Sequence, residues 1–209
     1  IVYGFGDIAG KAVLFLLLPV YTRIFAPAEY GFIETLTMLN NFLIIFLIMG
    51  MDAAQSFYFF EQKSLGKIAQ AGIITAIIQW RLIWGGIMVV LATLLSPILN
   101  ALFFNGGLSW EYFAIAFSGA LFAQLIGQST AIFQLLYKPL KYIGMTLAYV
   151  VISSAISVFL VVCFGWGVKG YFAGTCIGGI IITMFGFWLV RDYLDFSRLH
   201  KEWWPKLVK

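Results

Sequence analysis

Six ionisable side chains stand inside or at the edges of otherwise apolar stretches, and these residues could do chemistry. Burying a charge in hydrocarbon costs at least about 2.5–3.5 kcal/mol, so such residues usually face a wet cavity, a partner or a substrate. Each also has a structural alternative, namely a pair within one helix, a side chain that reaches the interface, or a solvated helix end. The six are Asp7, Lys11, Arg23, Glu34, Asp52 and Arg81.

Three of the six are cations, which suit a phosphate group. The planar fork of arginine donates two parallel charged hydrogen bonds, whereas lysine offers a point charge. We therefore expect Arg23, Arg81 and Lys11 to contact an anionic substrate group. The alternative for the two arginines is to extend to a lipid headgroup, or to pair with Glu34 or Asp52.

The other three are acids, and they suggest a coupling ion. We expect Asp7, Asp52 and Glu34 to carry a proton or a sodium ion, or to balance the cations. Asp7 lies four residues before Lys11, so the two share a helix face and could pair structurally. Beyond such an ion we expect no cofactor.

The usual signatures of catalysis are missing from the sequence. It has no His-Glu-His metal pattern, no nucleophile with a histidine nearby and no phosphate-binding loop of the Gly-Lys-Ser type. The single histidine, His200, lies in a basic, aromatic tail. We therefore expect neither enzyme activity nor a metal site, and no nucleic-acid partner.

The elements that carry these residues belong in a lipid bilayer. Hydrophobic residues make up 62% of the 209-residue chain and charged residues 11%, against about 45–50% and 25% in soluble domains. A crossing needs roughly 20 apolar residues, and the backbone in lipid must bond within its own segment. We predict an all-α integral membrane protein, a bundle of six transmembrane helices. Their approximate ranges are 1–25, 32–60, 68–104, 112–137, 143–164 and 171–190.

Short polar stretches separate these segments. We expect turns or loops at 26–31, 61–67, 105–109, 138–141 and 165–170. The third segment is longer than one crossing needs, so its first part should lie along the interface or project from the membrane. We place the six-helix lobe at 1–192 and an amphipathic, basic linker at 193–209.

Lysine and arginine are distributed unevenly between the loops, and cytoplasmic loops carry the excess. Two follow the odd-numbered segments, Arg23 and Lys169. We therefore expect a multi-pass membrane protein with the N-terminus and residue 209 in the cytoplasm. The nine that follow the even-numbered segments are Lys63, Lys67, Lys138, Lys141, Arg191, Arg198, Lys201, Lys206 and Lys209.

The tail has a helical pattern of its own. Phe196, Leu199, Trp203 and Leu207 recur at three- and four-residue steps, which places them on one helix face. This pattern predicts an interfacial helix with Trp203 and Trp204 at headgroup depth.

Three stretches carry a resemblance to a known family. Residues 18–31 read Leu-Pro-Val-Tyr-Thr-Arg-Ile-Phe-Ala-Pro-Ala-Glu-Tyr-Gly, residues 50–54 Gly-Met-Asp-Ala-Ala, and residues 167–171 Gly-Val-Lys-Gly-Tyr. Together they resemble the N-terminal half of the polysaccharide biosynthesis, or O-antigen, flippase family. That family belongs to the multidrug/oligosaccharidyl-lipid/polysaccharide exporter superfamily. Residues 56–58 depart from the pattern, because they are Ser-Phe-Tyr where the family often has an arginine.

The resemblance implies one lobe of a two-lobe transporter with roughly 12 to 14 helices, which works by alternating access. Its substrate would be undecaprenyl-diphosphate-linked oligosaccharide for surface polysaccharide such as O-antigen or capsule. It would lie in the bacterial cytoplasmic membrane, and its partners would be the lipid bilayer, that substrate and other polysaccharide assembly proteins. Three alternatives stay open: a cation-coupled multidrug exporter of the same superfamily, a membrane enzyme of glycan assembly, and a non-transporting scaffold.

Overall fold

Helices make up almost the whole of the described chain. The computed structural model describes residues 2–62, 66–195 and 203–204, without the side chains of residues 2, 3, 5 and 7. Within these ranges no strand occurs. The elements are α1 (Val2–Ile24), α2 (Pro27–Ile48), α3 (Met51–Glu61), α4 (Lys67–Leu94), α5 (Ser96–Phe104), α6 (Trp110–Leu135), α7 (Pro139–Phe164), α8 (Gly167–Leu189) and the short 3₁₀ helix η2 (Arg191–Tyr193).

The surface of the bundle is apolar, as a bilayer requires. Large hydrophobic side chains point outward, among them Phe15 (74% exposed), Leu16 (72%) and Met184 (69%). Among the described residues, five helical stretches are long and apolar enough to span a membrane: α2 with α3, α4, α6, α7 and α8. With the 23-residue α1, the bundle has six long helical stretches, and the predicted all-helical membrane fold is confirmed.

The second predicted segment is not one continuous helix, which corrects the sequence interpretation. It breaks at Met49 and Gly50, which adopt left-handed conformations with φ of 41° and 73°. In an unbroken helix the carbonyl of Phe46 would accept a bond from the Gly50 amide. Here the indole N–H of Trp84 on α4 donates to that carbonyl at 3.0 Å. The break therefore has a partner on the neighbouring helix.

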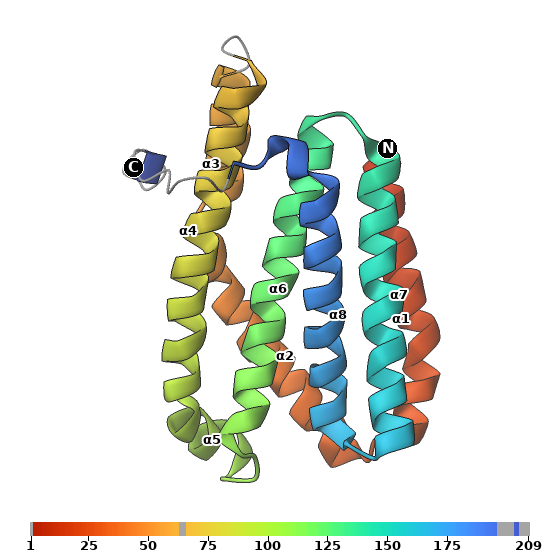
Figure 1. Cartoon of the computed structure of the whole chain (residues 1–209). Coiled ribbons are helices and arrows are strands. Elements are labelled where there is room, and N and C mark those ends of the chain that lie inside the picture. The colour runs from red at the N-terminus through yellow and green to blue at the C-terminus, as the bar shows by residue number, and fades with distance from the viewer. Residues whose placement is uncertain (1, 63–65, 196–202, 205–209) are drawn as a thin grey trace.

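The third predicted segment also divides. Helix α4 ends at Leu94, and α5 begins at Ser96 with Pro97 in its first turn. Proline has no amide hydrogen and favours the start of a helix, which explains the division there. The first turns of α4, together with α3, project beyond the other helices (Figure 1), as the length of this segment predicts.

Three predicted turns are shorter than expected. Helix α2 begins at Pro27, α7 at Pro139 and α8 at Gly167. A proline in the first turn loses no bond, because the first amides of a helix lack partners anyway. The Glu29 side chain also accepts a hydrogen bond from the amide of Ala26 at 2.9 Å and so caps α2.

The order of the helices places the lysines and arginines of the loops at two opposite ends of the bundle. The ends of α3, α6 and α8 lie at one end together with the start of α1, while α5 and the starts of α2, α6 and α8 lie at the other (Figure 1). Arg23 and Lys169 belong to the second end. The first end carries Lys67, Lys138, Lys141 and Arg191 among the described residues.

Part of the predicted linker lies outside the described residues, including Phe196, Leu199 and Leu207. The described part crosses α4: the amide of Asp195 donates to the Thr75 hydroxyl at 2.8 Å. Further on, Trp203 and Trp204 pack edge-on against Tyr58 and Trp80, with ring centroids 5.7 and 5.6 Å apart. These two tryptophans therefore contact α3 and α4.

Candidate functional site

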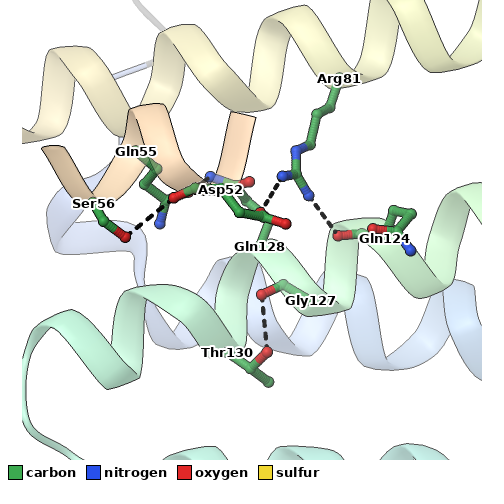
Figure 2. A network of polar contacts seen from close by, with 8 residues as sticks. All are labelled: Asp52, Gln55, Ser56, Arg81, Gln124, Gly127, Gln128 and Thr130. Carbon is green, nitrogen blue, oxygen red and sulfur yellow. Dashed lines mark hydrogen bonds and ion pairs between the residues drawn. The ribbon is translucent and has the colours of Figure 1, made fainter. Parts of the chain in front are cut away.

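An ion pair between two helices forms the centre of the candidate site. Arg81 on α4 is buried, at 2% exposed, and its Nη2 contacts the carboxylate of Asp52, whose side chain is 52% exposed. Its Nη1 donates to the carbonyl oxygen of Gln124 on α6 at 3.2 Å. Figure 2 shows the guanidinium between these two acceptors. Three elements, α3, α4 and α6, therefore meet at one cation.

The break in the second segment places Asp52 there. Because α3 starts anew at Met51, Asp52 stands in its first turn, where the helix dipole favours a negative charge. Helix α4 is continuous and brings Arg81 to the same level. The sequence interpretation named both residues and left their pairing as one of several alternatives.

One nitrogen of the guanidinium has no hydrogen-bond partner at all. Arg81 Nε is buried and has no hydrogen-bond partner. An unsatisfied donor on a charged group costs at least as much as a lost neutral hydrogen bond, about 1–3 kcal/mol. The Nε–H group of Arg81 therefore has the capacity to donate a hydrogen bond to a further anionic or polar oxygen.

A polar cavity of about 310 Å³ adjoins the ion pair. It combines one cation and one carboxylate with hydroxyl and amide groups and a tyrosine. A hollow of this kind can hold water or a small anionic group, and it would be unfavourable against lipid. Its lining residues are Asp52, Ser56, Arg81, Gln124, Gly127, Thr130, Ala131, Gln134, Leu135 and Tyr142.

A second polar contact lies next to the cavity and was missed by the sequence analysis. The Gln128 side-chain amide on α6 donates to the Gln55 side-chain oxygen on α3, and both side chains are buried, at 0% and 1% exposed. Figure 2 shows this pair beside Asp52. The signal was available, because an amide in an apolar helix requires a partner.

The other predicted site residues do not join this centre. Lys11 on α1, Arg23 at the end of α1 and Glu34 on α2 are exposed. None of these three forms an ion pair within the described side chains. Arg23 lines a separate shallow hollow with Pro19 at the opposite end of the bundle. The side chain of Asp7 lies outside the described atoms, so its predicted pairing with Lys11 stays a prediction.

The comparisons with known proteins concern the fold. No protein-family profile and no curated protein matches the sequence. A crystal structure of a proline mutant of a MATE protein superposes with a TM-score of 0.69 at 16% sequence identity, over 93% of this chain and 46% of that one. This chain therefore has a MATE-like helical membrane fold and spans about half the length of that protein.

Proposed function

We propose that this chain is one lobe of a membrane transporter that moves lipid-linked oligosaccharide, carried on undecaprenyl diphosphate, across the cytoplasmic membrane. Transport would proceed by alternating access, without making or breaking a covalent bond. The MATE-like fold supports a transporter of this superfamily. The resemblance of residues 18–31 and 50–54 to the polysaccharide flippases supports the choice of substrate.

The observation that carries the proposal is the state of Arg81. A buried arginine has one half-exposed carboxylate as its counter-ion and an unsatisfied Nε, beside a polar cavity. A diphosphate has several anionic oxygens, which would fill the free donor and replace the water lost from the anion. The polar groups around it, such as Ser56 and Gln134, would help to hold a hydrated headgroup.

The cavity also lies at the end where such a substrate would enter. The proposed orientation puts the ends of α3, α6 and α8 in the cytoplasm, because Lys67, Lys138, Lys141 and Arg191 gather there. Impermeant thiol labelling in whole cells would test this orientation. Cysteines at Ala28, Asn105 and Lys169 should be labelled, and one at Lys138 should be protected.

A second candidate is a cation-coupled exporter of small cationic compounds. The fold comparison favours it as much as the flippase, since the similar structure is a MATE protein. Its binding residues would be acids without a basic partner. Glu34 is exposed and forms no ion pair within the described side chains, whereas Asp52 is paired with Arg81.

Charge-preserving substitution of Arg81 separates the two candidates. In the full-length protein, Arg81→Lys should impair glycan export in a strain that lacks its own flippase, since lysine loses the bidentate fork. The variant should still insert at normal levels. Glu34→Gln is the matched acid variant, and it should leave glycan export unchanged. Normal export by Arg81→Lys, together with loss of dye efflux by Glu34→Gln, would favour the cation exporter.

A further inference from the structure

Helix α3 is a short helix, called the arm below, and it follows a break in the helical segment at Met49 and Gly50, called the joint. Two successive left-handed residues, Met49 and Gly50, separate it from α2. A side chain with a Cβ rarely adopts this conformation, so Met49 is held there by its surroundings. A Cβ added to Gly50 would meet nothing within 4 Å, so the glycine serves the backbone angle and not the packing. Trp84 supplies the bond that the break removes from the Phe46 carbonyl.

The arm is attached by a narrow stripe of residues. Within α3 the buried side chains are Met51, Gln55 and Phe59, one for each turn. One of the three is polar and bonds to Gln128. At the far end, the Gln70 side chain of α4 donates to the Phe59 carbonyl at 3.2 Å. The attachment therefore combines apolar packing of Met51 and Phe59 with polar contacts, and the polar contacts are the ones that can be exchanged for water or an anion.

The first polar contact after the joint is the Asp52–Arg81 pair. Asp52 is the second residue of α3, so this contact fixes the direction in which the arm leaves the joint. Its carboxylate is 52% exposed and can return to water at little cost. Arg81 is buried, and it has a second acceptor on another helix, the Gln124 carbonyl of α6. The Asp52–Arg81 pair can therefore open by movement of Asp52 alone, and it is called the latch below.

We propose that α3 is a hinged arm, latched by Asp52 on Arg81, and that an anionic group entering the cavity opens the latch by taking the place of Asp52. The inference rests on the proposed function for the identity of that anion. The anion and Asp52 carry the same sign and compete for one guanidinium. Arg81 Nε lacks a partner, and a phosphate group has more anionic oxygens to offer it than a carboxylate, which gives the phosphate an advantage. Release of Asp52 removes the polar contact nearest to Met49 and Gly50, and α3 then tilts about these two residues.

The movement is large enough to measure. An 11-residue helix is about 16 Å long, so a tilt of about 20° moves its far end by about 5 Å. Spin labels at Phe60, near the end of α3, and at Leu140, at the start of α7, would report this distance. Both side chains are exposed, at 45% and 81%. The full-length protein should carry Cys163→Ser and Cys176→Ala, with any cysteine outside residues 1–209 replaced as well, so that the labels attach at these two sites alone.

Two variants and one probe test the latch. Asp52→Asn should shift the Phe60–Leu140 distance by about 5 Å without any ligand. Millimolar inorganic pyrophosphate should shift it in the same direction in the parent protein. Should Asp52→Asn fail to fold, Asp52→Asn/Arg81→Gln leaves no unpaired charge; it should show the shift and no response to pyrophosphate. Glu111→Gln is the control, since it breaks an ion pair at the opposite end.

The outcomes separate this inference from the proposed function. An unchanged distance in the foldable Asp52 variants would overturn the hinged arm, even if Arg81 proves essential for glycan export. A shift in the variants, together with no response of the parent protein to pyrophosphate, would overturn opening by an anion. Loss of glycan export in Arg81→Lys would still support the proposed function in either case.

Discussion

The two sides of the bundle are built differently. Helices α7 and α8 pack through small residues, and a Cβ added to Gly178 would lie 2.6 Å from the Cα of Ser153. On the other side, α3 meets α4 and α6 through an ion pair and an amide pair, beside a cavity of about 310 Å³. Backbones in direct contact cannot shift without separating, whereas polar contacts can be exchanged. Helices α7 and α8 are therefore called the frame below. Helix α3, with its partners on α4 and α6, is called the working part, because its polar contacts can be exchanged.

The largest expected effect is on the frame. In Gly174→Ala the new Cβ would contact the backbone of Ser157, and a backbone cannot move aside as a side chain can. We expect a loss of about 3 kcal/mol, at the upper end of the usual cost of overpacking. Thermal unfolding of the purified protein in detergent would measure it.

The matched control lies on the helix next to it. Gly144 in α7 has nothing within 4 Å of an added Cβ, and alanine is the better helix former by about 0.5–1 kcal/mol. Gly144→Ala should therefore keep or slightly raise the melting temperature. Equal stability of the Gly174 and Gly144 variants would contradict the view of α7 and α8 as a closely packed frame.

The next effect concerns the working part. Asp52→Asn leaves Arg81 buried without a counter-ion. We expect a loss of about 2–3 kcal/mol, less than the 3–5 of a fully buried pair because the Asp52 carboxylate is half exposed. The double variant Asp52→Asn/Arg81→Gln should regain most of that loss. A double variant that is less stable than Asp52→Asn would show that the two residues do not act as a pair.

A smaller effect is expected at the joint. Trp84→Phe keeps the ring and removes the donor to the Phe46 carbonyl. One lost hydrogen bond corresponds to about 1 kcal/mol, so the melting temperature should fall modestly. Trp188→Phe is a suitable control, because Trp188 is exposed on α8, at 57%. If both variants behave alike, the indole does not stabilise the break.

The smallest effect is expected from the second ion pair. Lys169 and Glu111 join α8 to α6 at the opposite end, with side chains 36% and 45% exposed. Solvated pairs contribute about 0–1 kcal/mol and are screened by salt. Glu111→Gln should therefore change the melting temperature little, and less still at high salt. A loss as large as that of Asp52→Asn would remove the contrast between the two pairs.

The sequence predicted the features that depend on composition and local pattern. Long apolar runs gave the helices, and the uneven loop charges agree with the two ends of the bundle. The cost of a charge in hydrocarbon singled out Asp52 and Arg81. These two residues lie 29 positions apart on separate helices, and no local rule states which of six charges will meet.

The breaks in the helices and the contacts between buried polar side chains depend on how the helices pack. The left-handed Met49 could not be predicted, because a methionine in an apolar run is typical of a continuous helix. Gly50 and Pro97 are visible signals for helix boundaries, but neither residue by itself shows that a helix ends there. Gln55 and Gln128 were also visible, but only the meeting of α3 and α6 shows that one donates to the other.

Binding of a diphosphate to Arg81 tests the central claim most directly. Isothermal titration calorimetry would measure the affinity of a short-chain, water-soluble prenyl diphosphate for three proteins. These are the parent protein, Arg81→Lys and Lys169→Gln. We expect Arg81→Lys to weaken the affinity by at least about tenfold, or 1.4 kcal/mol, because the bidentate contact is lost. Lys169→Gln should bind as the parent does. Equal affinity of Arg81→Lys and the parent protein would contradict the account.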